Sequence, residues 1–289
     1  MEPLETVAIL GVGLIGGSIG LTLRARGLAQ KIIGVGRNPE KLAEAIRLGA
    51  IDQAETDVAK AVEFANVVVV CTPVGRIAED CCNAAHHGPE NLLVTDAGST
   101  KAAIVARVEE SAVAARKFVG AHPIAGSERN GVAAATADLF VGRTCILTPT
   151  SHTSPEKRNR ARLFWEALGL RVVEMSPKDH DHVLAFTSHL PHAVSAALAS
   201  TVPRDLVEFA AGAYRDGTRV AGANAGLWAE IFLANRSSVL EALTQFERHL
   251  CEFRSALSAR DATALMTWWQ EKRESSRPDS ETSSPGIDF

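Results

Sequence analysis

The sequence predicts an α/β protein in which a doubly wound parallel sheet is followed by an all-helical C-terminal part. Three observations support this fold class. Short β-branched runs alternate with helical stretches in the first half, a glycine-rich loop follows the first run, and helical periodicity prevails after about residue 150. Most of the runs are apolar throughout, which is typical of strands covered by helices on both faces.

The expected strands are short and are separated by helices. We expect them at residues 7–10, 31–36, 66–70, 91–96, 117–121, 144–149 and 171–175. The segments between them carry the apolar spacing of helices, with start signals at Pro39 and Thr100. Strands that alternate with helices in this way predict a sheet built from crossover units.

The second half of the chain is expected to be helical. Long Ala- and Leu-rich stretches predict helices at residues 180–200, 205–213, 224–256 and 259–273. We therefore expect an α/β domain over residues 1–175 and a helical domain over residues 176–273. The remaining tail, residues 274–289, is polar and rich in Ser and Pro, which predicts disorder.

The composition excludes several classes of function. The 289 residues carry a formal net charge of −4 and only 5% are aromatic, so no basic field or stacking platform for nucleic acid is expected. No apolar run reaches the length of a membrane span. The five cysteines match neither a disulfide framework nor a zinc pattern, which favours reduced thiols and a cytoplasmic location.

The glycine-rich loop after the first strand predicts a dinucleotide site. It has the GxGxxG spacing, in which the first glycine allows a tight turn, the second lets a pyrophosphate approach, and the third lets helix pack on strand. The helix that follows adds backbone amides and the positive end of its dipole. A glycine-rich turn in another kind of α/β protein is the alternative. The expected cofactor-binding residues are Gly11, Gly13, Leu14, Ile15 and Gly16.

The residues after the second strand bear on the choice of cofactor. Gly36 stands where a site for NAD usually carries an acid, and Arg37 follows it. An arginine beside a small residue can bind the 2′-phosphate of NADP, so the sequence favours NADP over NAD. Alternatively, Arg37 stacks on the adenine or stays in solvent, and NAD is accepted as well. Thr72 and Pro73 follow the next strand and are expected at the same ligand-binding edge.

His122 is the first candidate for catalysis. It follows the strand at 117–121, so it is expected at the carboxyl edge of the sheet, facing the cofactor. An imidazole there can take a proton from a substrate hydroxyl, and a purely structural histidine is the alternative. Ser99 lies in the loop 96–101 at another strand end, where a simple helix N-cap is the alternative to a functional role.

Further candidates lie in the helical half. His189 and His192 are three residues apart and share a helix face, shortly after the segment 179–182, which reads DHDH. This spacing fits no familiar zinc site, so no metal is expected. Arg219 offers a bidentate fork for a carboxylate, and Trp228 offers a flat apolar wall. A surface ion pair and ordinary core packing are the respective alternatives.

Taken in order, a set of motifs resembles the prephenate/arogenate dehydrogenase family of tyrosine biosynthesis. The motifs are GVGLIGGSIG, CTPV, DAGSTK, GAHPIAGSE, SHLPH, GTRVA and LWAEIFLAN, and they span roughly residues 5–270. The resemblance implies a Rossmann-type domain followed by an α-helical dimerisation domain, and hence a homodimer. It also implies NAD(P)-dependent oxidative decarboxylation of prephenate to 4-hydroxyphenylpyruvate, or of arogenate to tyrosine. SHLPH looks more like the prephenate-using branch.

The resemblance also implies roles for individual residues. His122 is expected to accept the proton or hydrogen bond of the substrate's C4 hydroxyl, and Ser99 to help place that hydroxyl. Arg219 is expected to bind a substrate carboxylate, with Asp216 and Glu128 positioning it and gating the entrance. The pocket is expected to be completed by His189, His192 and Trp228.

Two other interpretations of the motifs stay open. A β-hydroxyacid, imine or 6-phosphogluconate-type dehydrogenase has the same architecture, but its lysine-dependent branch needs a catalytic lysine, and none lies between Lys178 and Lys272. A nucleotide-sensing or interaction protein keeps such a fold without chemistry. The joint presence of Ser99, His122, His192 and Arg219 argues against that second class.

Overall fold

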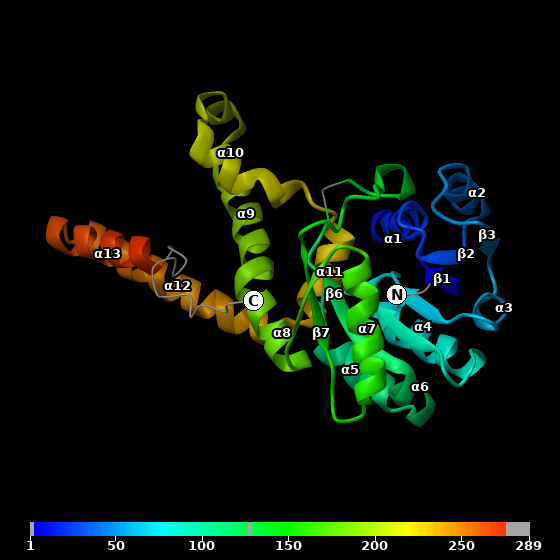
Figure 1. The fold of residues 1–289 in the computed structure, drawn as a ribbon. Helices are drawn as coiled ribbons and strands as arrows, with labels where there is room; N and C mark the ends of the chain where they lie inside the picture. The colour runs from blue at the N-terminus through cyan, green and yellow to red at the C-terminus, as the bar shows by residue number, and fades with distance from the viewer. Residues whose placement is uncertain (1–2, 127–128, 276–289) are drawn as a thin grey trace, which may run out of the picture. The chain divides into compact units, whose positions relative to one another are not determined.

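The computed structural model describes residues 3–126 and 129–275, and divides the chain into two compact units, residues 1–239 and 240–289. The first unit holds the sheet, the helices around it and the first part of the helical half (Figure 1). The second unit consists of most of α12 (Arg236–Ser258) and of α13 (Ala262–Ser275). Within the described ranges, no helix is both long and apolar enough to span a membrane.

One sheet organises the first unit, with strand order β3-β2-β1-β4-β5-β6-β7-β8. The order reverses between β1 and β4, so the chain builds outward in both directions from that point. In doubly wound sheets, ligands bind at this switch point, outside the carboxyl ends of the strands. The strands are β1 Leu4–Leu10, β2 Ala29–Val35, β3 Gln53–Glu55, β4 Val67–Val70, β5 Leu93–Asp96, β6 Phe118–Pro123, β7 Thr144–Thr148 and β8 Arg171–Glu174.

All seven expected strands form, but two features of the sheet differ from the prediction. The edge strand β3 was not expected, because its sequence Gln-Ala-Glu carries no apolar signal. The expectation of a parallel sheet is wrong at β7, which pairs antiparallel with β6, while β8 pairs parallel with β7. A parallel neighbour needs a crossover, and the described part of the β6–β7 connection holds only the 3-10 turn Val132–Ala134. Helix α7 (Pro155–Ala167) supplies that crossover between β7 and β8.

Helices cover both faces of the sheet, and alternate strand residues supply two apolar cores. Val7 and Ile9 of β1 join one core, whereas Ala8 and Leu10 join the other, and all four are at most 2% exposed. Helices α1 (Leu14–Ala25), α2 (Pro39–Arg47) and α7 pack on the first face. The opposite face is covered by α3 (Val58–Val62), α4 (Val74–His87), α5 (Ala102–Glu109) and α6 (Ala112–Lys117).

Local signals explain where several helices begin. Helices α2, α7 and α8 (Pro177–Leu184) each start with a proline preceded by a polar cap, as the start signal at Pro39 predicted. The expected start at Thr100 is wrong by two residues, since α5 begins at Ala102 and has no capping side chain of its own. A residue 79 positions along the chain, Asp181, binds its first amides instead.

The second half of the chain is helical, as predicted, but the expected long helices are interrupted. The stretch expected as one helix at 180–200 contains α8, the π-helical turn Ala185–His189 (η2) and α9 (Leu190–Thr201). The expected helix 205–213 is wrong, because the 3-10 helix Arg204–Phe209 ends before α10 (Gly212–Thr218) begins. Helix α11 (Ala225–Ala234) has Asn235 as its C-cap, just before α12. The predicted domain boundary at 175/176 lies between β8 and α8, and residues 276–289 of the predicted tail lie outside the described residues.

A buried ion pair joins β5 to β6 where their backbone ladder stops. The ladder pairs only Val94 with Phe118 and Thr95 with Val119. Beyond it, Asp96 accepts the Ala121 N–H (3.0 Å), and Lys101 Nζ donates both to Asp96 and to the Ala121 carbonyl (2.9 Å). The side chains of Asp96 and Lys101 are fully buried. They therefore set the position of the strand end that carries His122.

Substitution Lys101→Met should destabilise the fold strongly. It leaves the Asp96 carboxylate buried without its cation, which costs about 3–5 kcal/mol of unfolding free energy. Urea unfolding measures this, and Arg107→Met is the matched control, because the Arg107–Glu110 pair is 70% and 62% exposed and contributes about 0–1 kcal/mol. Equal losses in the two variants would contradict the account.

Candidate active site

The loop between β1 and α1 is shaped for a phosphate group. Gly11 has φ +92°, and a Cβ on it would lie 2.7 Å from the Cys71 carbonyl oxygen. A Cβ on Gly16 would lie 2.2 Å from the Gly11 oxygen, so both positions exclude a side chain. A Cβ on Gly13 would meet nothing within 4 Å, which leaves this backbone open to a ligand at the amino end of α1. The loop therefore fits a dinucleotide pyrophosphate.

A cavity of about 950 Å³ opens beside this loop, at the carboxyl ends of the central strands. Five of the residues expected to bind the cofactor line it: Gly11, Gly13, Arg37, Thr72 and Pro73. Three other predicted residues are not part of its lining and instead form the first turn of α1: Leu14, Ile15 and Gly16.

The prediction missed several residues that line the same cavity. Among them are Lys41 and Arg76 on helices, and Asn130–Ala133 in the β6–β7 connection. Asp80 also lines the cavity, and its carboxylate accepts from Thr72 Oγ1 (2.7 Å) and pairs with Arg76 (2.9 Å). Asp80 is only 4% exposed, so it holds Thr72 in place at the cavity wall. The lining residues come from segments that are far apart in the sequence, and they meet at the cavity because of the strand order, which no local motif reveals.

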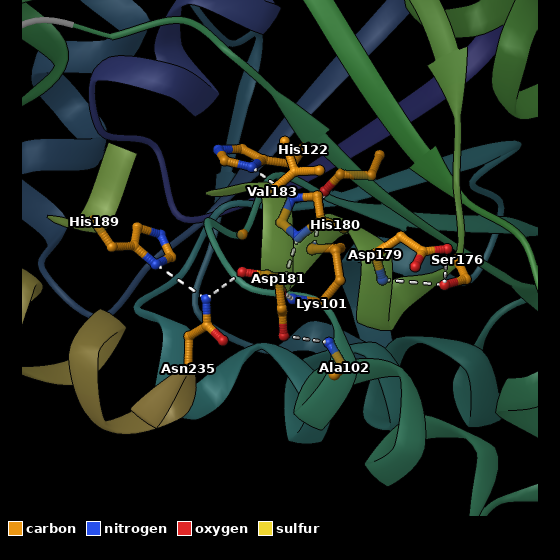
Figure 2. Close-up of polar contacts among 12 residues, drawn as sticks. Lys101, Ala102, His122, Ser176, Asp179, His180, Asp181, Val183, His189 and Asn235 are labelled. Atoms are coloured by element: carbon orange, nitrogen blue, oxygen red, sulfur yellow. Dashed lines mark hydrogen bonds and ion pairs between the residues drawn. The ribbon is translucent and has the colours of Figure 1, made fainter. Parts of the chain in front are cut away.

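A second site is built around the end of β6, where three side chains form a row of hydrogen bonds (Figure 2). His122 Nδ1 lies 2.9 Å from His180 Nε2, and His180 Nδ1 lies 2.8 Å from Asp181 Oδ1. Asp181 also accepts the backbone N–H groups of Lys101 (2.7 Å) and Ala102 (2.9 Å). His180 is fully buried and Asp181 is 3% exposed, whereas His122 is half-buried. The row thus runs from the protein interior to the accessible side of His122.

Asn235 links the same row to a second histidine. Its Nδ2 donates to the Asp181 backbone carbonyl (2.6 Å) and lies 3.1 Å from His189 Nδ1. Figure 2 draws both contacts as dashed lines. His189 is the last residue of the π-helical turn η2, a rare element that is frequent at functional sites. Asn235 is the C-cap of α11, so the end of that helix is held against α8 and η2.

Burial keeps these histidines neutral. Loss of hydration is the largest cause of the shift in each of them. The pKa of His122 is lowered well below its usual value, with further lowering by His180, Lys101 and His189. The pKa of His180 is lowered although Asp181 opposes the change, and the pKa of His189 falls to about 4. A neutral imidazole near pH 7 has one nitrogen free to accept a proton, as general base catalysis requires.

An aromatic wall stands next to His189. Trp228 of α11 stacks on His192 with ring centroids 3.7 Å apart, and forms a T-shaped pair with His189 at 6.0 Å. His192 Nδ1 lies 2.9 Å from the Ser188 carbonyl. The His192 ring is therefore held by this contact and by its stacking on Trp228. The structure therefore joins three predicted residues, His189, His192 and Trp228, to His122 through the polar row.

Other predicted residues are not connected to this cluster. Among the described residues, no hydrogen bond joins Ser99 to His122. Arg219 begins the 3-10 turn Arg219–Gly222 (η4), which packs against α9, and it is exposed. The described part of the chain shows no ion pair between Arg219 and the exposed Asp216. Glu128 lies outside the described residues, so the roles of these four residues stay predictions.

Two protein-family models match this chain, one after the other. The model of the prephenate dehydrogenase nucleotide-binding domain matches residues 19–174, and the model of the prephenate dehydrogenase dimerization domain matches residues 176–271. A prephenate dehydrogenase of Bacillus subtilis is 33% identical over 93% of this chain and 75% of its own length.

The chain belongs to the prephenate dehydrogenase family. Its fold agrees with solved structures of such enzymes. Prephenate dehydrogenase from Aquifex aeolicus, in complex with hydroxyphenyl propionate and NAD+, has a TM-score of 0.87 at 35% identity, covering 94% of this chain and 96% of that one. Synechocystis arogenate dehydrogenase has a TM-score of 0.80 at 30% identity, covering 93% and 98%.

Sequence reasoning missed three residues of this family member's polar cluster. His180 and Asp181 were considered only as metal ligands, and Asn235 appeared only as the last residue of the motif LWAEIFLAN, without a role of its own. The structure uses the first two in a hydrogen-bonded row and the third as a bridge to His189. A His-Asp pair next to a helix start could have signalled such a row, but its partner His122 is 58 residues away in the sequence.

The lowered histidine pKa values make stability depend on pH. Below pH 6.5 the unfolded chain binds a proton at His189, whereas the native protein does so only near pH 4. The free energy of unfolding should therefore fall as the pH drops from 6.5 to 4, by about 3 kcal/mol for this residue. His122 and His180 act in the same direction.

The variant His189→Asn isolates this contribution. Its amide oxygen replaces Nδ1 as the acceptor for Asn235, but it binds no proton. Urea unfolding followed by circular dichroism between pH 4 and 7 should show a weaker pH dependence in the variant than in the wild type. Parallel curves for the two proteins would contradict the lowered pKa.

Proposed function

We propose that this enzyme oxidises and decarboxylates prephenate to 4-hydroxyphenylpyruvate with a nicotinamide cofactor, in tyrosine biosynthesis. The observation that carries the proposal is His122, half-buried at the carboxyl end of β6 with Nδ1 bound to His180. Its Nε2 makes no hydrogen bond to any described residue, so it is available to a substrate. The family, and the relatives that are named for this reaction, support the same substrate.

His122 has the chemistry that the reaction requires. A nicotinamide held in the cavity beside Gly11 and Gly13 would supply the acceptor for the hydride that leaves C4 of the substrate ring. His122 Nε2 accepts the hydrogen bond of the C4 hydroxyl and stabilises the positive charge that develops on it. Loss of the ring carboxylate as carbon dioxide returns an electron pair to the ring, which becomes aromatic. The protein therefore has mainly to orient the ring and to bind one hydroxyl.

The remaining predicted residues bind or place the substrate in this proposal. Ser99 places the C4 hydroxyl, and Arg219 binds a carboxylate through its guanidinium fork. Asp216 and Glu128 position Arg219 and gate the entrance. The neutral His189 and the stacked pair of His192 and Trp228 support the proposal, since they offer a donor and a flat wall to the substrate.

Arogenate is the second candidate substrate, because an arogenate dehydrogenase is among the similar solved structures. The two substrates differ in the side chain, which is a keto acid in prephenate and an amino acid in arogenate. The direct test is reduction of NAD and of NADP with each substrate, followed at the absorbance of the reduced nicotinamide. Activity with prephenate supports the proposal, and activity with arogenate alone replaces it. Cofactor binding with no activity in all four assays would indicate a non-enzymatic protein of this fold.

Substitution His122→Asn should lower kcat by about 10²–10⁴-fold, the scale of a lost proton acceptor. The asparagine amide can still donate to His180, so the polar row stays satisfied. Titration of the cofactor, followed by tryptophan fluorescence, should give an unchanged Kd and serves as the control. Near-normal kcat would remove His122 from the mechanism.

We also propose that NADP is preferred over NAD. Gly36 leaves no carboxylate at the end of β2, and Arg37 and Lys41 both line the cavity there. Two cations beside a glycine favour a 2′-phosphate.

Substitution Arg37→Ala should lower kcat/KM for NADP about 10–100-fold more than for NAD, because it removes a charge-assisted contact. The control Arg47→Ala removes an exposed arginine at the end of α2, the helix that follows Arg37. Arg47 does not line the cavity, and its distance to Glu44 is 3.8 Å. This control should change neither value. Equal losses for both cofactors in Arg37→Ala would contradict NADP preference.

We propose a cytoplasmic homodimer as the working form. The dimerization-domain match covers the helical half, and that half exposes large apolar side chains, with Phe209 77% and Leu233 73% exposed. A second copy of the chain is the partner that such a surface favours. All five cysteines are free thiols, which favours a reducing compartment.

A further inference from the structure

We infer that His180, Asp181 and Asn235 are positioning residues that hold two histidines of the site in opposite tautomers. His122 then presents Nε2 as an acceptor, and His189 presents Nε2–H as a donor. The use made of the two rings rests on the proposed function. The tautomers themselves follow from the hydrogen bonds and can be measured without a substrate.

The row that ends at His122 has one direction. Asp181 accepts two backbone N–H groups, through Oδ1 from Lys101 and through Oδ2 from Ala102. Its carboxylate is thus an acceptor, and His180 Nδ1 donates to Oδ1. A neutral His180 then has a lone pair on Nε2, which accepts from His122 Nδ1. A neutral His122 keeps its own lone pair on Nε2.

The charges around the row favour neutral rings. His180 is fully buried, and Lys101, whose positive charge acts on both rings, is already paired with Asp96 and the Ala121 carbonyl. Burial lowers the pKa of both His122 and His180, in each case as the largest cause. A proton received at His122 is stabilised through His180 by the Asp181 carboxylate, as in the Ser-His-Asp arrangement.

The bond to His189 has the opposite sense. The Asp181 backbone carbonyl can only accept, so the atom of Asn235 that lies 2.6 Å from it is the amide nitrogen. The second hydrogen of that nitrogen points to His189 Nδ1 at 3.1 Å. Nδ1 of His189 is therefore the acceptor, and a neutral His189 carries its proton on Nε2. Burial and the neighbouring His180 and His192 lower the pKa of His189 to about 4, so it is neutral at pH 7.

One dipeptide therefore determines both protonation patterns. The side chains of His180 and Asp181 determine the tautomer of His122, and the backbone carbonyl of Asp181 determines that of His189 through Asn235. A hydroxyl that donates its proton meets an acceptor at His122. A carboxylate or carbonyl oxygen meets a donor at His189. The site can thus distinguish the hydroxyl end of a substrate from an anionic group without any change in net charge.

Nitrogen-15 NMR of the protein labelled at its histidine side chains tests the inference directly. At pH 7, His122 should show the pattern of the Nδ1–H tautomer and His189 that of the Nε2–H tautomer. Signals are identified by their loss in His122→Asn and His189→Asn. The wild-type spectrum alone can overturn the inference. It would do so if His122 were the Nε2–H tautomer or His189 the Nδ1–H tautomer.

Two substitutions at His180 separate its two hydrogen bonds. In His180→Gln, the amide oxygen can replace Nε2 and still accept from His122, so the tautomer and most of kcat should persist. In His180→Asn, the amide nitrogen can replace Nδ1 and donate to Asp181, but His122 loses its acceptor. That variant should lose the pure Nδ1–H pattern and about a hundredfold in kcat, with little change in KM. Equal kcat values in these two variants would contradict a positioning role for His180.

The control is His182→Gln, an exposed histidine two residues further along α8, which should keep the wild-type spectrum of His122 and the wild-type kcat. Failure of the proposed function can be distinguished from failure of this inference. In the first case the wild-type protein oxidises neither substrate, but the tautomer signals are still as predicted. If a His180 variant does not fold, the wild-type spectra still decide the inference.

Discussion

The carboxylate of Asp181 is the interaction on which the rest of the site depends. It receives the backbone N–H groups of Lys101 and Ala102 and the Nδ1–H of His180. These donors come from α5 in the α/β part and from α8 in the helical half. One buried acceptor thus satisfies a helix start that has no cap of its own and orients an imidazole at the same time. Because buried acceptors and donors are costly when unpaired, the two tasks cannot be separated.

The same region shows how the fold positions the chemistry. The ladder between β5 and β6 is short, and the Asp96–Lys101 pair continues it to Ala121, the residue before His122. Lys101 takes part twice, through its side chain to Asp96 and through its backbone to Asp181. His122 is therefore held from the sheet side by the ion pair and from the helix side by His180. Stability and orientation of the site rest on the same few polar groups.

Local sequence patterns predicted those features of the fold that depend on neighbouring residues alone. The apolar runs marked seven strands, and the glycine spacing marked a loop whose geometry excludes side chains at Gly11 and Gly16. The direction of β7 could not be predicted, since it depends on a connection without a crossover helix. His180 and Asn235 were missed because their partners lie 58 and 46 residues away in the chain. Resemblance of motifs predicted His122 as the reacting histidine, whereas its hydrogen-bond partner His180 emerges only from the three-dimensional arrangement.

A neutron diffraction structure of the deuterated enzyme tests most directly that the Asp181 carboxylate sets the protonation of the site. The account predicts deuterium on Nδ1 of both His180 and His122, none on Nε2 of either ring, and deuterium on Nε2 of His189. Deuterium on His180 Nε2, or on an Asp181 oxygen, would reverse the row and contradict the account.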